Sequence, residues 1–214
     1  MAEFIVIEGL DGTGKTTQIG LLAEELSSRG IKTVTTAEPT SLPTGKLLRR
    51  VLSGETESSP WSTAALFLAD RIQHNCAEDG ILQSLKNGCT VISDRYYYST
   101  FAYQGSETDL DWTMNMHYSC PLIRRPDLVI FLTADVDVCL ERINANRPAD
   151  AIEIYENAEA LSRTKSLFER VFDKIKDREN IVFVDASGTV DEVRRRILNA
   201  YDTFFSNKKD CKNE

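Results

Sequence analysis

Short apolar runs alternate along the chain with longer segments in which apolar residues recur every three or four positions. The runs lie at Phe4–Ile7, Lys32–Thr35, Thr90–Ser93, Leu128–Leu132 and Ile181–Val184. Their length and composition predict five strands, and the spacing in between predicts helices. Strands that alternate with helices in this way form parallel sheets covered by helices on both faces. The pattern therefore predicts an α/β protein in three layers, with a five-stranded parallel sheet at its centre.

The composition agrees with one globular unit. The chain has 214 residues, 42% of them hydrophobic, which suits one domain with a sizeable core. We expect this domain over residues 1–206 and a polar C-terminal tail over 207–214. The net charge of −8 argues against a general nucleic-acid-binding or membrane surface, but it does not argue against one anionic ligand. No apolar run is long enough to predict a membrane span.

The cysteines and histidines give no sign of a metal cluster. The five cysteines are odd in number and scattered, and they lie at positions 76, 89, 120, 139 and 211 without a C-x-x-C pair. This pattern favours reduced thiols in a cytoplasmic protein over a disulfide framework. His74 and His117 are isolated in the sequence.

The first strand is followed by a phosphate-binding motif. The stretch GLDGTGKTT, Gly9–Thr17, fits G-x-x-x-x-G-K-[ST] without a gap. Its glycines let successive backbone N–H groups point at anionic oxygens. Lys15 adds a positive charge, the Thr16 hydroxyl is a Mg²⁺ ligand, and a helix starting near Lys15 directs its positive dipole at the phosphates. The motif predicts that a nucleotide binds here.

Two further features lie where they would face this loop. Asp94 and Arg95 follow the third strand, where a carboxylate suits Mg²⁺ and a guanidinium suits a phosphate, although a structural ion pair is an equal alternative from these two residues alone. Phe67 and Arg71 are four residues apart in the predicted helix Trp61–His74, so they share a face that could stack a base and bond its edge. The alternative, a core ring beside a solvated charge, is favoured by this pair alone.

Four segments together closely resemble thymidylate kinases. They are FIVIEGLDGTGKTTQ, LFLADR, VISDRYYYSTFAYQG and VDASGTVDEV, and the resemblance extends from Phe4 to about Phe205. It implies a P-loop kinase fold with a small lid at about residues 142–153. It also implies transfer of the γ-phosphoryl group of ATP to dTMP with Mg²⁺, in a homodimer.

The resemblance also implies roles for individual residues. Asp11, Lys15, Arg95 and Arg147 would act in catalysis, and Thr16 and Asp94 would hold the metal. ATP would bind to Gly9, Leu10, Asp11, Gly12, Thr13, Gly14, Lys15, Thr16, Thr17 and Arg142. The acceptor dTMP would bind to Asp11, Glu38, Arg49, Phe67, Arg71, Arg95, Ser99, Thr100, Tyr103, Gln104 and Tyr155. Within this set Phe67 would stack on thymine, Arg71 would bond its exocyclic oxygen, and Tyr103 would crowd the 2′ position of the sugar.

The sequence departs from the family pattern in two places. Bacterial members usually have Thr-Arg-Glu-Pro after the second strand, whereas this chain has Ala37 in place of the arginine, and Arg49 is the nearby candidate to supply the charge. One class of the family has an arginine in the phosphate loop, where this chain has Gly12. The lid candidates are then Arg142, expected against adenine, and Arg147, expected at the transferring phosphoryl group.

Three alternatives remain at this stage, and a fourth, a GTPase switch, is excluded. A deoxynucleoside kinase would have Glu-Arg-Ser where this chain has Asp94-Arg95-Tyr96, and another pyrimidine monophosphate kinase would differ in its acceptor base. A GTPase switch would need an Asn/Thr-Lys-x-Asp motif, which the sequence does not contain. A nucleotide-binding regulator without kinase activity is the alternative from another functional class.

Overall fold

The computed structural model describes residues 2–146 and 158–210. All five predicted strands are confirmed, and each extends one or two residues further towards its carboxyl end than the apolar run. The strands are β1 (Phe4–Gly9), β2 (Thr33–Ala37), β3 (Thr90–Asp94), β4 (Leu128–Thr133) and β5 (Ile181–Asp185). Every pairing is parallel, and the strand order is β2-β3-β1-β4-β5. The predicted α/β class is therefore confirmed.

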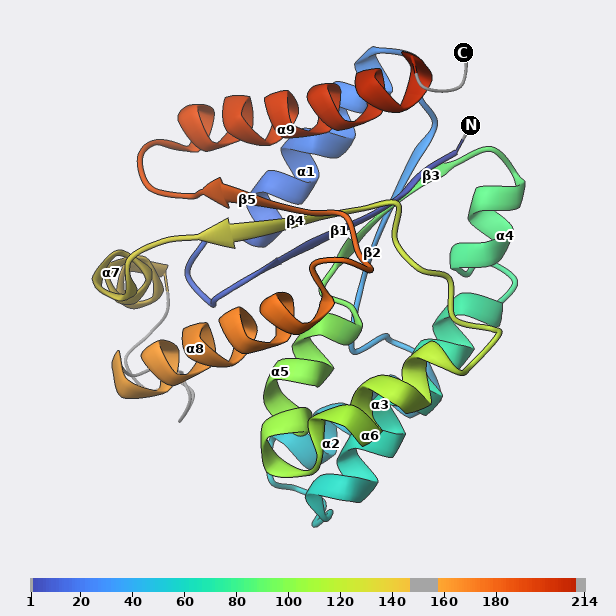
Figure 1. Cartoon of the computed structure of the whole chain (residues 1–214), viewed down its shortest axis with the longest axis vertical. Coiled ribbons are helices and arrows are strands. Elements are labelled where there is room, and N and C mark those ends of the chain that lie inside the picture. The colour runs from blue at the N-terminus through green and yellow to red at the C-terminus, as the bar shows by residue number, and fades with distance from the viewer. Residues whose placement is uncertain (1, 147–157, 211–214) are drawn as a thin grey trace.

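Helices cover both faces of this sheet (Figure 1). Helices α1 and α9 lie on one face, and α5 and α8 lie on the other, with α2, α3 and α6 beyond α5. The described helices are α1 (Lys15–Ser28), α2 (Pro43–Leu52), α3 (Pro60–Cys76), α4 (Ile81–Lys86), α5 (Tyr97–Glu107), α6 (Leu110–Tyr118), α7 (Val136–Asn146), α8 (Ala158–Ile175) and α9 (Val190–Asp210).

The core is built from the central strands and the apolar faces of the helices. Every residue of β1 is buried, and β4 is buried except at its last residue. Helix α9 places Val193, Ile197, Tyr201 and Phe205 at a spacing of four residues on its buried face. On the other face, Phe131 of β4 packs against Phe168 and Phe172 of α8. Both layers thus fix the sheet from which the site loops extend.

Two segments are more regular than the sequence suggests. The Pro- and Ser-containing segment after β2 leads directly into α2, which begins at Pro43, because proline is well suited to the first turn of a helix. Helix α9 continues to Asp210, so it enters the segment 207–214 for which a polar tail is predicted.

The strand order sets the position of the first loop. The chain builds β2 and β3 on one side of β1 and then β4 and β5 on the other. Ligands of open α/β sheets bind beyond the carboxyl ends of the strands, where this order reverses. In register, Ile7 lies beside Asp94, and Ala37 lies beside Asp94 on the other side. The loops after β1, β2 and β3 therefore meet at one end of the sheet.

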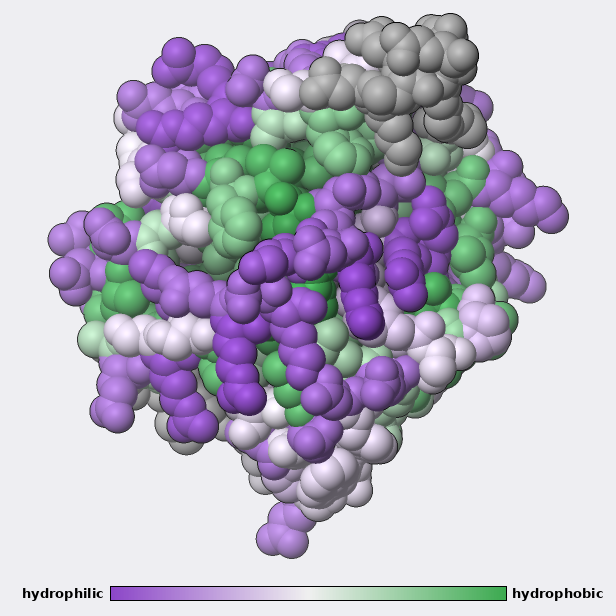
Figure 2. All heavy atoms as spheres, viewed as in Figure 1, coloured by the Kyte–Doolittle hydropathy of each residue, from purple (hydrophilic) through white to green (hydrophobic). Residues whose placement is uncertain are grey.

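The surface is mostly hydrophilic on the face shown in Figure 2. Hydrophobic residues reach this surface in the region of β5 and α9. Phe183 of the edge strand β5 is 56% exposed and lines a groove there together with Ala200 and Phe204. No helix within the described residues is long and apolar enough to cross a membrane.

Candidate active site

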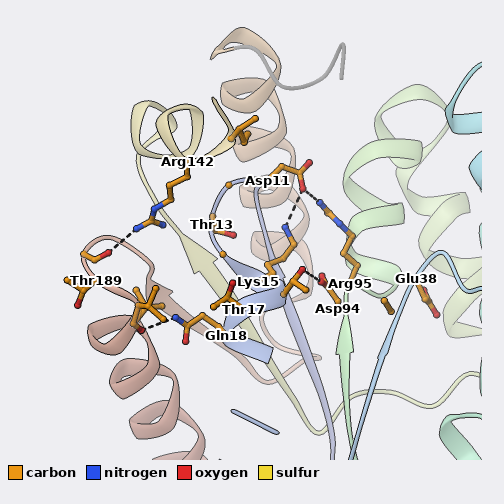
Figure 3. Close-up of a pocket in the computed structure, with 18 of the residues that line it drawn as sticks. Asp11, Thr13, Lys15, Thr17, Gln18, Glu38, Asp94, Arg95, Arg142 and Thr189 are labelled. Atoms are coloured by element: carbon orange, nitrogen blue, oxygen red, sulfur yellow. Dashed lines mark hydrogen bonds and ion pairs between the residues drawn. The ribbon is translucent and has the colours of Figure 1, made fainter. Parts of the chain in front are cut away.

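The phosphate loop connects β1 to α1, which begins at Lys15 as predicted. Gly12 and Gly14 have φ angles of 82° and 87°, which side chains disfavour, so the glycines of the motif permit this path. The Lys15 ammonium donates to the carbonyl oxygens of Gly9 at 3.0 Å and Leu10 at 2.9 Å. Figure 3 shows Lys15 directed into the loop beside Asp11. Burial and the neighbouring positive charge of Arg95 lower the pKa of Lys15.

The two predicted metal ligands are in contact. The Thr16 hydroxyl donates to Oδ2 of Asp94 at 3.0 Å, because β1 and β3 are adjacent and their carboxyl ends coincide. A hydroxyl and one carboxylate beside a phosphate loop fit Mg²⁺, which is usually bound through one or two protein oxygens, waters and substrate phosphates. Among the described residues no group of three or more His, Cys, Asp or Glu side chains forms a metal site.

Arg95 lies at the centre of the site. Its Nη2 donates to Oδ1 of Asp11 at 2.5 Å (Figure 3). Its Nη1 donates to the Ser99 hydroxyl at 3.0 Å. Its guanidinium lies 6.0 Å from the centre of the Tyr103 ring. Burial opposes the charged form of Arg95, but the charge of Asp11 raises the pKa of Arg95. Burial also opposes the charge of the half-buried Asp11, but Arg95 and Lys15 together lower the pKa of Asp11. Both groups are therefore held in their charged forms.

Arg95 has an unusual backbone conformation. Its φ of 66° is the only positive φ of a non-glycine residue in the part of the chain that the structure describes. Left-handed backbone at a residue with a side chain costs about 1–2 kcal/mol. Such strain persists where the surrounding contacts fix it, and it is frequent at functional sites.

Glu8 supplies part of those contacts, and sequence reasoning missed it. This carboxylate is fully buried at the end of β1. It accepts hydrogen bonds from the backbone N–H groups of Tyr96 at 3.0 Å and Ser99 at 3.2 Å, and from the Ser99 hydroxyl at 2.8 Å. Glu8 thus holds the first turn of α5 and, through Ser99, the guanidinium of Arg95. A charged residue directly after four buried apolar positions was the available signal, because buried carboxylates are rare without partners.

A cavity of about 640 Å³ surrounds the phosphate loop. Arg142 of α7 lines it and donates to the carbonyl oxygens of Ala186 and Gly188 at 3.0 Å each, which ties α7 to the loop after β5. Gln18 of α1 holds the start of α9 by donating to the Val190 carbonyl oxygen at 2.9 Å. Gly188, Thr189 and Val190, which follow β5, therefore form one wall of this cavity.

A second cavity, of about 370 Å³, lies between the loop after β2 and helices α3 and α5. Of the predicted acceptor residues, the ones that line it are Asp11, Glu38, Phe67, Arg71, Arg95, Ser99, Tyr103 and Gln104. Thr100 lies behind Arg71 and accepts a hydrogen bond from its Nη2 at 3.3 Å. The Tyr103 ring packs edge-on against Phe168 of α8, which fixes its position at the wall of the cavity.

The two cavities share three residues, namely Asp11, Glu38 and Arg95. Arg49 lines the phosphate-loop cavity, as does Ala37, and it donates to the carbonyl oxygen of Pro39. The positive charge that is missing at position 37 is thus available from α2 in the same cavity.

Arg71 is not the solvated charge that the sequence alternative suggested. It is 1% exposed, and its Nε donates to Oε2 of Glu38 at 2.9 Å. Nη2 donates to the same carboxylate oxygen. Phe67, one helical turn earlier, is partly buried and lines the cavity with it.

Comparison with known proteins agrees with this arrangement. The sequence profile described as Thymidylate kinase matches residues 7–197. The chain belongs to the thymidylate kinase family. It is 37% identical to a probable thymidylate kinase from Methanosphaera stadtmanae, an alignment that covers 92% of this chain and 95% of the relative. It is 35% identical to a probable thymidylate kinase from Thermococcus kodakarensis, with 94% and 98% covered. It is 33% identical to a thymidylate kinase from Leptospira borgpetersenii, with 96% of each chain covered.

In this thymidylate kinase family member, the phosphate loop has no space for an arginine at position 12. A Cβ atom on Gly12 would lie 2.4 Å from the carbonyl oxygen of Cys139 in α7, which is far inside contact distance. Helix α7 therefore packs directly against the loop. Of the predicted lid, residues 142–146 belong to the end of α7, and Arg147 and Tyr155 lie outside the described residues.

Proposed function

We propose that this chain transfers the γ-phosphoryl group of ATP to dTMP and releases dTDP and ADP. The observation that carries the proposal is the pair of cavities that share Asp11, Glu38 and Arg95. One contains a phosphate loop, and the other contains an aromatic ring beside a buried guanidinium. Membership of the thymidylate kinase family supports the same reading.

On the donor side, the loop from Gly9 to Thr17 would hold the phosphates of ATP. Lys15 would exchange its bonds to the loop carbonyls for bonds to phosphate oxygens. Arg142 would lie against adenine, since it lines the cavity at the wall formed by Gly188 and the residues after it. Thr16 and Asp94 would hold Mg²⁺, which supplies charge neutralisation at the phosphates when it is bound.

On the acceptor side, Phe67 would stack on thymine and Arg71 would donate to its exocyclic oxygen. Tyr103 would crowd the 2′ position, because α8 holds its ring at the cavity wall. Gln104 is buried at the same wall and would contact the base edge. Arg49 would contact the acceptor phosphate in place of an arginine at position 37.

The reaction needs positioning and charge neutralisation more than proton transfer. An oxygen of the dTMP phosphate forms the new bond to the γ-phosphorus, while the bond to the bridging oxygen breaks and its electrons remain on ADP. The attacking oxygen is already anionic, so this step needs no general base. Arg95, held by Asp11 and Ser99 between the cavities, would offset the repulsion between donor and acceptor phosphates. Arg147 is proposed to act on the same charge.

An acceptor panel tests the proposal. Turnover with ATP and Mg²⁺ is measured for dTMP, dUMP, dCMP, UMP and thymidine, and dTMP is expected to have the highest kcat/KM. Higher turnover of thymidine would favour the deoxynucleoside kinase alternative, and higher turnover of UMP would contradict the role of Tyr103. ATP binding without turnover of any acceptor would favour the regulator.

We also propose a homodimer in the cytoplasm, with residues 1–206 as a single kinase domain. The exposed rings of Trp61 and Trp112 lie 4.9 Å apart on α3 and α6, and paired exposed indoles are typical of an interface. The cysteines at positions 76, 89, 120 and 139 are free thiols, which agrees with a reducing compartment. Sedimentation velocity of the purified chain tests the dimer.

A further inference from the structure

The guanidinium of Arg71 is held by groups from three separate parts of the chain. Glu38, after β2, accepts from Nε and Nη2, and Thr100 of α5 accepts from Nη2. His117 of α6 lies at the third nitrogen, with Nε2 2.6 Å from Nη1 of Arg71. The ring of Tyr96 lies 4.9 Å from Cζ and covers one face of the guanidinium. His117 is 1% exposed, so water does not compete for this contact.

The contacts of His117 fix its protonation state. Nδ1 lies 2.8 Å from the carbonyl oxygen of Thr113, which can only accept, so Nδ1 carries the proton. Arg71 can only donate, so Nε2 must be an unprotonated acceptor. His117 is therefore a neutral imidazole in one tautomer, and burial together with the charge of Arg71 lowers its pKa to about 3.

Counting the N–H bonds of Arg71 shows what this acceptor does. A guanidinium has five N–H bonds. The contacts among described residues use one at Nε, two at Nη2 and one at Nη1. The second Nη1–H is left for a ligand, and Arg71 lines the acceptor cavity. Because the guanidinium is planar and rigid, its contacts with His117 and Glu38 together fix the direction of the remaining Nη1–H.

We propose that His117 is a positioning residue that determines base specificity, because it aims the free Nη1–H of Arg71 at the 4-position of the acceptor base. A thymine carries an oxygen there, which accepts. A cytosine carries an amino group, which donates, so an immobilised N–H donor would face it without a bond. A site built to hydrogen-bond one partner rejects an analogue that cannot, because a buried polar group is left unpaired. This inference rests on the proposed dTMP kinase function.

Two substitutions separate the contact of His117 with Arg71 from its contact with Thr113. In His117→Gln the side-chain oxygen reaches the position of Nε2 and can accept from Arg71. In His117→Asn the shorter amide can donate to Thr113, as Nδ1 does, but it does not reach Arg71. His74→Asn is the matched control, since His74 contacts the other oxygen of Glu38 at 2.9 Å and Thr36 at 2.7 Å, within the same network.

The experiment measures kcat/KM for dTMP and dCMP, KM for ATP, and thermal stability for the wild type and the three variants. We expect His117→Asn to raise KM for dTMP and to reduce the dTMP-to-dCMP ratio by roughly ten-fold, the effect of one hydrogen bond to a charged group. KM for ATP should not change, and His117→Gln should restore most of the ratio. His74→Asn should lower stability and leave the ratio as in the wild type.

The outcomes separate this inference from the proposed function. A wild type that does not prefer dTMP would overturn the proposed function itself. A wild type that prefers dTMP, with an unchanged ratio in His117→Asn, would overturn the role of His117. Equal loss in His117→Asn and His117→Gln, or equal loss in His74→Asn, would indicate a purely structural role and would also overturn it.

Discussion

At the scale of single residues, the site depends on buried and half-buried charges whose partners come from distant positions. Glu38 binds Arg71 and His74, Glu8 binds the start of α5, and Asp11 binds Arg95. Removing one partner of a buried ion pair leaves an uncompensated charge and is strongly destabilising. Substitutions here therefore change stability as well as activity, and tests must separate the two.

At Arg95, the effects of a substitution on stability and on activity can be separated through the backbone conformation. Arg95→Ala and Arg95→Gly remove the same guanidinium, but only glycine relieves the left-handed φ of 66°. Both variants should lose most of kcat. Arg95→Gly should be more stable than Arg95→Ala by about 1 kcal/mol in urea unfolding. Equal stability would show that the backbone at this position is not strained.

The neutral state of His117 predicts a pH dependence of stability. Its pKa is about 3 in the folded chain against an ordinary 6.5, so between these values the unfolded chain binds a proton that the folded chain does not. Stability should therefore fall as pH falls through this window, by up to about 1.4 kcal/mol per pH unit from this group. Urea unfolding from pH 7 to pH 4 should show a steeper loss for the wild type than for His117→Gln. Parallel curves would contradict a buried neutral histidine.

At the scale of elements, α7 and α9 fix the loop after β5 from two sides. Arg142 of α7 donates to the carbonyl oxygens of Ala186 and Gly188. Arg196 of α9 donates to those of Asp185 at 2.9 Å and Ser187 at 2.6 Å. Of these two arginines, Arg142 lines the phosphate-loop cavity, and Arg196 lines the groove beside β5.

This arrangement supplies a matched pair of variants. Arg142→Ala should raise KM for ATP by about ten-fold, the effect of losing a charged contact, while KM for dTMP stays the same. Arg196→Ala removes a similar hold on the loop without removing a cavity residue, so its KM for ATP should change much less. Steady-state kinetics for both substrates give the answer. A similar rise in both variants would assign the effect to the loop and not to a nucleotide contact.

The packing of α7 on the phosphate loop can be measured through glycine. Gly12 and Gly30 have similar φ angles, 82° and 79°, but a Cβ at Gly12 meets Cys139, whereas at Gly30 it meets nothing within 4 Å. Gly30→Ala should cost about 1 kcal/mol from backbone strain alone. Gly12→Ala should cost at least 1 kcal/mol more, because the overlap forces the backbone to move. Thermal unfolding without nucleotide tests this. An equal loss of stability in the two variants would show that α7 moves away from the loop without a cost in free energy.

The strands and helices could be predicted from the sequence more fully than the contacts between them. The strands and the start of α1 are local features, and their apolar runs and motif residues predict them within one or two positions. Contacts such as Arg71 with His117 join residues 46 positions apart on two helices, and no periodic pattern specifies which polar groups meet. From sequence, His117 was an isolated histidine. Family resemblance named eight residues that line the acceptor cavity and Thr100 behind Arg71, but it named neither Glu8 nor His117.

At the scale of the whole molecule, the two cavities are formed by segments from both halves of the sheet. The loop after β1 contributes to both, the loop after β2 and helices α3 and α5 complete one, and α7 with the loop after β5 completes the other. Because the cavities share Asp11, Glu38 and Arg95, donor and acceptor phosphates would meet there.

This continuity predicts tight binding of a bridging ligand. Adenosine and thymidine joined through a chain of phosphates should bind more tightly than ATP or dTMP alone, since linking avoids part of the entropy cost of binding two molecules. Isothermal titration calorimetry should give one site per chain and an affinity at least a hundred-fold above that of dTMP. Binding no tighter than ATP alone would mean that the two cavities are not occupied together.

The contact between Gly12 and the Cys139 carbonyl also constrains how this chain can change during evolution. Because an arginine in the phosphate loop needs the space that α7 occupies, a single codon change at position 12 would meet the helix backbone before it could supply a useful charge. A lineage with this packing would have to shift α7 first, or at the same time. The glycine therefore makes it difficult for natural selection to place an arginine in the phosphate loop in one step.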